Sequence, residues 1–267
     1  MTVLLTNDDG IYAPGLYALH HELKADHQVC VVAPETEMSA VGHAITLSLP
    51  IRVRSVQRDG SFYGHAVTGT PADCVKIAVQ ELLDRPPDVI LSGINPGSNV
   101  GVNILYSGTV SAATEGAFMG VPSAAISLDT RTNPDYRFAA RFSREIIRFM
   151  MENPMSDGTA LNVNVPAVPA REIKGVSLVR QGLSMFDERY ERRSDPRGNV
   201  YYWLAGEKII ENGGTDCDSA VLKEKKITIT PIHYDLTCLP ELERLKAAAP
   251  SFGLEPNGTS SSIPNTK

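Results

Sequence analysis

Short apolar runs alternate with segments of helical periodicity through the first 166 residues. An apolar run of about 4–8 residues bounded by turn-forming residues is typical of a buried strand. Such runs predict strands at Thr2–Thr6, His27–Pro34, Pro87–Gly93, Pro122–Leu128 and Ala160–Pro166. Between them, apolar residues spaced three or four positions apart predict helices at Gly15–Ala25, from Thr70 to before Pro86, at 111–120 and at 136–153.

An additional hairpin interrupts this alternation. The segments 51–57 and 61–69 flank the pair Asp59-Gly60, a turn signal that favours two antiparallel strands. The remaining strands are separated by helices, and such crossovers place parallel strands in a sheet that is covered on both faces. We therefore predict an α/β fold with a doubly wound, Rossmann-like and mostly parallel sheet.

The pattern changes after residue 180. The segment 186–204 is charged, then turn-like at Asp195–Gly198, then aromatic, which predicts a projecting β-hairpin. A strand at 226–232 and a helix at 239–248 follow, before a stretch rich in Ser, Pro, Gly and Asn. These changes predict an α/β core at residues 1–180, a projecting hairpin and C-terminal oligomerisation arm at 181–250, and a disordered tail at 251–267.

The hairpin carries an unusual aromatic run. Tyr201 and Tyr202 precede Trp203, the only tryptophan in the chain. Because aromatic side chains are enriched in the cores of protein interfaces, we expect the region from Gln181 to Trp203 to form an oligomer contact.

Composition and charge narrow the possible partners. The chain has 267 residues, of which 42% are hydrophobic and 21% charged, with a net charge of −6. A net negative charge argues against electrostatic binding of nucleic-acid polymers over a wide surface. Any phosphate should therefore be bound at one site, by a metal ion or by backbone amides. No apolar stretch approaches the roughly 20 residues that cross a bilayer, and the N-terminus lacks a signal-peptide pattern. With four scattered cysteines and no CxxC spacing, we expect a soluble cytoplasmic protein without a membrane partner.

Polar side chains follow several of the predicted strands at the point where each strand ends. They comprise Asn7, Asp8, Asp9 and Gly10; a loop with Ser39, Gly42 and His43; the stretch Ser92–Gly101; and the segment Tyr106–Thr109. Taken singly, each has an ordinary explanation as a turn, a helix cap or a structural histidine. Because parallel strands bring their carboxyl ends to one edge of the sheet, we expect these groups to converge there.

Four of these residues carry oxygen atoms suited to a cation. Asp8 and Asp9 are adjacent carboxylates, and Ser39 and Asn95 add a hydroxyl and an amide oxygen. Oxygen donors suit Mg²⁺ or Mn²⁺, whereas zinc prefers His and Cys. The sequence predicts one divalent cation per subunit, with Gly10 permitting a sharp turn after the acidic pair.

The sequence also predicts a phosphate-binding site beside the cation site. The glycine-rich loop around Asn99 and the helix start at Ser107, Gly108 and Thr109 offer backbone N–H groups and hydroxyls. A cation beside such an anion site is typical of phosphoryl transfer or phosphate-ester hydrolysis.

Six motifs in this order resemble the SurE (survival protein E) family of nucleotidases, covering most of residues 1–130. They are LLTNDDG, APETEMSAVGHAIT, GTPADCV, SGINPGSNVG, YSGTVSAATEG and GVPSAAIS. The resemblance implies a metal-dependent phosphomonoesterase that acts on nucleoside 5′-monophosphates and often 3′-monophosphates. It carries metal ligation onto Asp8, Asp9, Ser39 and Asn95, and phosphate contacts onto Asn99, Ser107, Gly108 and Thr109. It also implies a homodimer or homotetramer with an exchanged C-terminal arm.

The catalytic roles are assigned only in part. Asp8 and Asp9 are the candidate catalytic residues, one as a fixed ligand and the other as general base, without a choice between them. One alternative is an aspartyl-phosphate phosphatase, in which an aspartate itself attacks phosphorus. A second is a nucleotide-binding sensor without enzymatic activity. The preferred base, 5′ against 3′ specificity, polyphosphate cleavage, the metal used and dimer against tetramer stay open.

Overall fold

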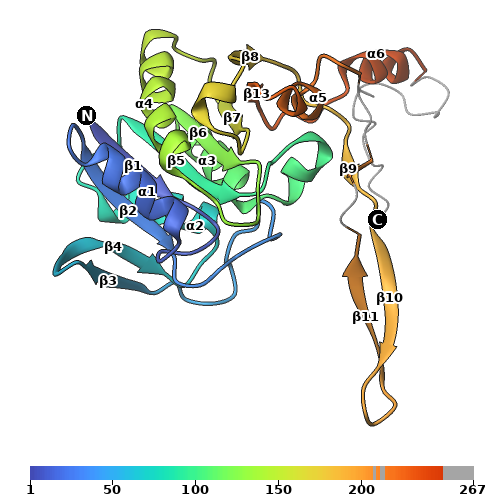
Figure 1. The fold of residues 1–267 in the computed structure, drawn as a ribbon, viewed down its shortest axis with the longest axis horizontal. Helices are drawn as coiled ribbons and strands as arrows, with labels where there is room; N and C mark the ends of the chain where they lie inside the picture. The colour runs from blue at the N-terminus through green and yellow to red at the C-terminus, as the bar shows by residue number, and fades with distance from the viewer. Residues whose placement is uncertain (207–208, 211–213, 249–267) are drawn as a thin grey trace, which may run out of the picture. The chain divides into compact units, whose positions relative to one another are not determined.

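A nine-stranded sheet forms the centre of the unit Met1–His233 (Figure 1). The computed structural model describes residues 1–206, 209–210 and 214–248. In spatial order the strands are β3 (Val53–Arg58), β4 (Ser61–Val67), β2 (Gln28–Pro34), β1 (Thr2–Thr6), β5 (Val89–Pro96), β6 (Ser123–Leu128), β7 (Ala160–Val165), β13 (Ile227–Ile232) and β8 (Val176–Leu178).

The strand order reverses direction beside β1. The chain moves outward from β1 to β2 and then returns to add β5 on the other side of β1, with parallel pairing on both sides. Parallel pairing continues through β6 and β7, whereas the pairs β3–β4 and β7–β13 are antiparallel. The predicted doubly wound, mostly parallel α/β fold is confirmed, and its switch point lies between β1 and β5.

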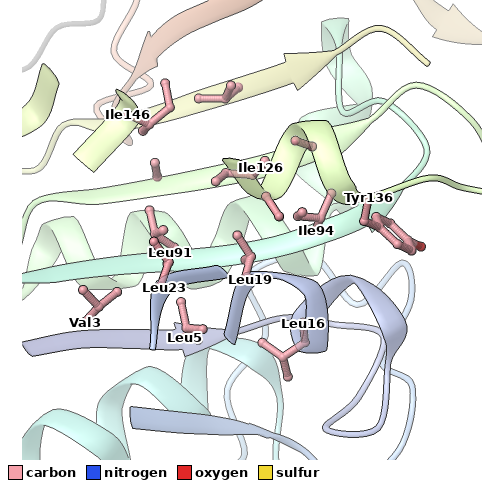
Figure 2. Close-up of a cluster of buried hydrophobic side chains, with 14 of the residues drawn as sticks. Val3, Leu5, Leu16, Leu19, Leu23, Leu91, Ile94, Ile126, Tyr136 and Ile146 are labelled. Atoms are coloured by element: carbon pink, nitrogen blue, oxygen red, sulfur yellow. The ribbon is translucent and has the colours of Figure 1, made fainter. Parts of the chain in front are cut away.

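Helices cover both faces of the sheet. The helices α1 (Pro14–Leu23) and α4 (Arg137–Glu152) pack on one face, and α2 (Pro71–Ile77) and α3 (Gly108–Phe118) pack on the other (Figure 1). Figure 2 shows Leu16, Leu19 and Leu23 of α1 against the central strands. In β1, Leu5 faces this cluster whereas Leu4 belongs to the cluster under α2, as the alternation of side chains along a strand requires.

Local sequence signals explain several element boundaries. Thr70 and Asp73 form the reciprocal hydrogen bonds of a capping box at the start of α2, with Pro71 in the first helical position. The turn between β3 and β4 has positive φ at Asp59 and Gly60, as the Asp-Gly signal predicts.

Short elements occupy several connections that the periodicity leaves unassigned. They are a π-helical turn η1 (Ala78–Leu82), the 3₁₀ turns η2 (Gly101–Tyr106) and η3 (Ala170–Glu172), the helix α5 (Asp218–Lys223), and the paired strands β9 (Met185–Phe186) and β12 (Ile209–Ile210). Among the described residues, no helix is long and apolar enough to cross a bilayer.

One strand from the region after residue 180 belongs to the nine-stranded sheet. The strand β13, expected in the arm, pairs with β7 and β8, and its residues from Ile227 to Thr230 are buried. An apolar strand next to the unpaired edge of β7 gains hydrogen bonds and burial there, which explains this placement. One compact unit spans Met1–His233, and a second begins at Tyr234 and contains α6 (Leu239–Ala248). The tail expected at 251–267 lies outside the described residues.

The expected hairpin consists of β10 (Arg189–Ser194) and β11 (Val200–Ala205), which pair in antiparallel orientation. Asp195 organises its turn, because its side chain accepts hydrogen bonds from the backbone N–H groups of Arg197 and Asn199. Tyr201, Tyr202 and Trp203 are exposed by 40%, 59% and 58%, so no core buries this aromatic run among the residues that the structure describes.

Candidate active site

The acidic pair directly follows β1. The Nδ2 of Asn7 donates to the carbonyl oxygen of Gly10 at 3.0 Å, which closes a tight turn around both aspartates. Gly10 has φ +96°, a conformation that glycine adopts without strain. The side chain of Asp8 is buried and that of Asp9 is half-buried. The predicted sharp turn is therefore present, and it places two carboxylates at the carboxyl edge of the sheet.

The start of α3 lies against Asp8. The hydroxyl of Thr109 donates to Oδ1 of Asp8 at 2.5 Å, although 101 positions separate the two residues. A Cβ added to Gly108 would lie 2.6 Å from Cβ of Asp8, closer than real Cβ contacts. Because only glycine permits this close approach, Gly108 allows the start of α3 to pack directly against the side chain of Asp8.

Burial and mutual repulsion raise the pKa values of both aspartates. Burial is the main cause of the raised pKa of Asp8, and hydrogen bonds from Thr109 oppose it. Burial and the charge of Asp8 raise the pKa of Asp9 to about 7, with a smaller contribution from Glu37. The Oδ2 atom of Asp9 is buried without a hydrogen-bond partner in the described structure. These carboxylates thus lack compensating positive charge, which a divalent cation would supply.

The loop after β2 approaches Asp8 through its backbone. The N–H of Met38 donates to the carbonyl oxygen of Asp8 at 2.7 Å, which brings the next residue, Ser39, to the acidic turn. Ser39 is exposed, and its hydroxyl donates to Oε1 of Glu37 at 2.5 Å. Glu37 is a site residue that the sequence analysis missed. Its only sequence signal is a third acid two positions before Ser39.

A buried carboxylate anchors the same loop farther along. Nε2 of His43 lies 2.7 Å from Oε2 of Glu115 in α3, and Lys76 of α2 pairs with the other oxygen of Glu115 at 2.9 Å. Burial opposes ionisation of Glu115, yet the bonds from His43 and Lys76 lower its pKa overall. His43 therefore connects the Ser39 loop to α3.

Asn95 lies at the carboxyl end of β5, the strand beside β1. Its Nδ2 atom donates to the carbonyl oxygen of Gly97 at 2.7 Å, so its side-chain oxygen is not used in that bond. Because β1 and β5 pair in parallel, with Thr6 opposite Ser92, the segments that carry Asp8 and Asn95 leave the sheet at the same edge. The geometry thus brings the predicted ligand segments together.

Asn99 is held by a buried polar network. Its N–H donates to Oδ1 of Asn164 at 2.7 Å, and its side-chain nitrogen donates to Oγ of Ser127 at 2.8 Å. Its carbonyl oxygen accepts from the side chains of Asn162 and Asn164. These three partners were not identified from the sequence, although asparagines inside the buried run 160–166 are a signal that could have found them. Asn99 thus fixes its loop to β6 and β7.

The hydroxyls at the start of α3 have partners within the protein. Ser107 caps the helix by accepting from the N–H of Val110 at 3.2 Å, and Thr109 donates to Asp8. The helix start still presents backbone N–H groups, which are the usual means by which a helix N-terminus holds phosphate. The phosphate contacts of Asn99, Ser107, Gly108 and Thr109 stay predictions.

The donor set fits a hard divalent cation. It combines the carboxylates of Asp8 and Asp9 with the hydroxyl of Ser39 and the amide oxygen of Asn95. Within the described residues, no group of three or more His, Cys, Asp and Glu side chains could hold a metal, so a nitrogen- and sulfur-rich zinc site is not found there. The unpartnered, buried Oδ2 of Asp9 is the structural feature that a bound cation would explain.

Comparisons with known proteins agree on one family. The family model described as survival protein SurE matches residues 3–188. A protein of Syntrophus aciditrophicus named 5′-nucleotidase SurE is 55% identical over 92% of this chain and 93% of its own length. One of Syntrophobacter fumaroxidans with the same name is 54% identical over 89% of this chain and 95% of its own. The crystal structure of the SurE protein from Aquifex aeolicus matches with a TM-score of 0.79 and 37% identity, covering 93% of this chain and 100% of that one.

These matches cover most of the chain and include the strand β1, the acidic turn and the start of α3. The class of protein is therefore a Rossmann-like α/β protein with an acidic site at the carboxyl edge of its sheet. The chain belongs to the SurE family.

Proposed function

We propose that this protein is a divalent-metal-dependent phosphomonoesterase that hydrolyses nucleoside 5′-monophosphates, and also 3′-monophosphates, to nucleoside and phosphate. The observation that carries the proposal is the uncompensated pair Asp8 and Asp9 in contact with the start of α3. The relatives that are 54–55% identical are named 5′-nucleotidase SurE, and SurE family nucleotidases are metal-dependent.

The residues Asp8, Asp9, Ser39 and Asn95 would hold one Mg²⁺ or Mn²⁺ ion per subunit. A bound divalent cation supplies positive charge that polarises the phosphoryl group and favours ionisation of water. The hydrogen bond from Thr109 holds the carboxylate of Asp8 in one orientation, as a metal ligand requires. Burial and the charge of Asp8 raise the pKa of Asp9 to about 7, so a carboxylate oxygen of Asp9 that does not hold the cation would accept the proton of the attacking water as general base.

The remaining site residues position the phosphate. The oxygen of water attacks phosphorus, the ester P–O bond breaks, and the nucleoside leaves with a proton while inorganic phosphate stays behind. Backbone N–H groups at Gly108 and Thr109, at the start of α3, would stabilise the negative charge that grows on the phosphoryl oxygens. Asn99, held by Asn164 and Ser127, keeps the glycine-rich loop rigid beside them.

Two alternatives are less favoured. An aspartyl-phosphate phosphatase usually carries an Asp-x-Asp pattern after its first strand, whereas Asp8 and Asp9 are adjacent. A sensor that only binds nucleotides needs no general base, and the curated relatives carry the name of an enzyme. A trapped phospho-enzyme would favour the first alternative, and metal-dependent phosphate release would exclude the second.

The proposal extends to assembly and location. The exposed aromatic run from Tyr201 to Trp203 supports a homodimer or homotetramer in which the arm at 181–250 is exchanged between subunits. The four cysteines Cys30, Cys74, Cys217 and Cys238 are free, which fits a reducing cytoplasmic compartment. The partners are nucleoside monophosphates, not nucleic-acid polymers or membranes.

Phosphate release tests the function directly. The substrates are adenosine 5′-monophosphate, its 3′ isomer, the other nucleoside monophosphates, polyphosphate and an aryl phosphate, each with Mg²⁺, Mn²⁺, Ca²⁺ or chelator. We expect release from 5′-monophosphates with Mg²⁺ or Mn²⁺ and none with chelator. Equal release with chelator, or no release from any nucleotide, would overturn the proposal.

A further inference from the structure

A buried carboxylate outside the catalytic set lies between the glycine-rich loop and the base of the projecting hairpin. Asp218, the first residue of α5, is fully buried. Its Oδ2 accepts a hydrogen bond from the N–H of Gly101 at 2.9 Å, across 117 positions of the chain. Its Oδ1 accepts from the N–H groups of Gly182 and Ser219, both at 2.8 Å. Three backbone donors therefore satisfy a carboxylate that water does not reach.

Gly101 leads directly into the candidate phosphate site. It lies two positions after Asn99 and begins η2, after which Ser107 caps α3. Gly101 has φ +61°, and a Cβ there would lie 2.2 Å from the carbonyl oxygen of Ser184. The loop can therefore approach Ser184 this closely only through a glycine.

The segment 181–184, which precedes β9 and the hairpin, makes two further bonds to the same loop. Nε2 of Gln181 donates to the carbonyl oxygen of Gly101 at 3.0 Å. The N–H of Val102 donates to the carbonyl oxygen of Ser184, also at 3.0 Å. Gly101 is thus held through both its N–H and its carbonyl oxygen, in each case by a side chain from after residue 180.

The glycine-rich loop consequently has two anchors of different origin. Asn99 is bonded to Asn164 of β7 and Ser127 of β6, which attach it to the sheet. Asp218 attaches Gly101 to the segment that carries the hairpin. A segment with one fixed end can still rotate, so the second anchor is needed to fix the direction in which the following backbone N–H groups point.

We propose that Asp218 is a positioning residue for the phosphate site, which acts through the N–H of Gly101. It holds the loop and η2 so that the start of α3 is aimed at the phosphoryl group. The assignment rests on the proposed function, because it uses the phosphate site at Asn99 and the start of α3. Asp218 does not touch the substrate, and its carboxylate acts only through backbone groups.

An isosteric variant tests the bond to Gly101. Asp218→Asn keeps the shape of the side chain but leaves one oxygen as acceptor. That oxygen can accept from Gly182 and Ser219, which places the amide NH₂ against the N–H of Gly101 and breaks that bond. The opposite orientation of the amide would break two bonds instead of one.

A second variant and a control accompany it. Gln181→Ala removes the other side-chain bond to Gly101 from a half-buried position, without placing an amide in the core. Asp216→Asn is the matched control, because this exposed acid of the same segment pairs with Arg180 instead. The readouts are kcat and KM for adenosine 5′-monophosphate, equilibrium binding of inorganic phosphate to the protein with saturating Mn²⁺, and melting temperatures in chelator and in Mn²⁺.

We expect KM for the nucleotide and Kd for inorganic phosphate to rise about tenfold in Asp218→Asn and about threefold in Gln181→Ala. Mn²⁺ should raise the melting temperature of both variants as it does for the wild type, since the proposed metal ligands are unchanged. Asp216→Asn should match the wild type in KM and phosphate binding.

Wild-type KM and phosphate binding in Asp218→Asn and Gln181→Ala would overturn the positioning role, and so would a lower melting temperature without weaker phosphate binding. A lost response to Mn²⁺ would also overturn it, because the damage would then extend beyond the phosphate loop. If the wild type binds phosphate but hydrolyses no phosphate ester, the proposed function fails and phosphate binding by the variants alone decides the role of Asp218. A wild type that binds no phosphate would overturn both.

Discussion

The acidic turn after β1 and the hairpin β10–β11 are opposite departures from the rule that apolar groups are buried and charges are solvated. At the turn, Asp8 is buried and Oδ2 of Asp9 lacks a partner. At the hairpin, Tyr202 and Trp203 are more than half exposed. Each region is thus incomplete by itself, one lacking positive charge and the other lacking apolar cover.

The difference indicates what completes each region. A buried carboxylate is stabilised by a cation or a proton, so the turn is suited to a metal ion. Exposed aromatic surface is stabilised by another apolar surface, so the hairpin is suited to a second protein chain. Removing the metal should therefore destabilise the acidic turn without changing self-association, and dilution should reduce association through the hairpin without changing metal binding.

The largest expected effect is at the turn. Asp8→Asn removes a charged ligand, so phosphate release should fall by about 100-fold or more. In chelator, the same variant should melt at a higher temperature than the wild type, because the repulsion between Asp8 and Asp9 is relieved. Thermal melts with chelator and with saturating Mn²⁺ measure both effects.

Saturating metal should raise the melting temperature of the wild type far more than that of Asp8→Asn, since binding to the folded state stabilises it. A wild-type melting temperature that does not respond to metal would contradict the metal site. Near-normal turnover of Asp8→Asn would do the same.

The hydrogen bond between Thr109 and Asp8 predicts the next effect. Thr109→Val keeps the shape of the side chain but releases the carboxylate, so metal affinity and turnover should each fall about 10- to 100-fold. Thr228→Val is the matched control, because the hydroxyl of this buried threonine of β13 has no hydrogen-bond partner among the described residues. Metal titration and steady-state kinetics distinguish the two variants. A loss of turnover with intact metal affinity would place Thr109 at the phosphate only.

At the hairpin, Trp203→Glu should weaken self-association. A central aromatic residue contributes about 2 kcal/mol or more to an interface, which corresponds to roughly 30-fold in the association constant. Sedimentation at several concentrations measures the change, with Phe62→Glu as control because Phe62 is exposed by 57% on β4. The same mass for Trp203→Glu and wild type at every concentration would remove the interface assignment.

The smallest expected effect is a pH dependence of stability in the metal-free protein. The pKa of Asp9 is about 7 in the folded protein and lies near 3.8 when unfolded, so the folded state binds the extra proton between these values. The contribution of Asp9 to stability therefore falls as pH rises from about 4 to 7. Asp9→Asn should remove this slope, so its gain in melting temperature over the wild type in chelator should be larger at pH 7.5 than at pH 5. Parallel pH profiles for both proteins would contradict the raised pKa.

Local sequence patterns determined most of the elements and the identity of the candidate ligands. The helix start at Thr70, the Asp59-Gly60 turn and the strand periodicities depend on residues that are neighbours in the chain. Asp8 and Asp9 stand out for a similar reason, because two acids directly after a buried strand are visible in any short window. Whether all four candidate residues bind the metal stays a prediction.

Only the tertiary structure decided how distant segments meet. The bond from Thr109 to Asp8 spans 101 positions, and that from Asn99 to Asn164 spans 65. The insertion of β13 beside β7 likewise depends on which sheet edge is left unpaired once the other strands are in place. Periodicity describes which face of an element is apolar, but it carries no information on which partner covers that face. Pairings between distant segments are fixed by the order of strands in the sheet, and that order exists only in the folded chain.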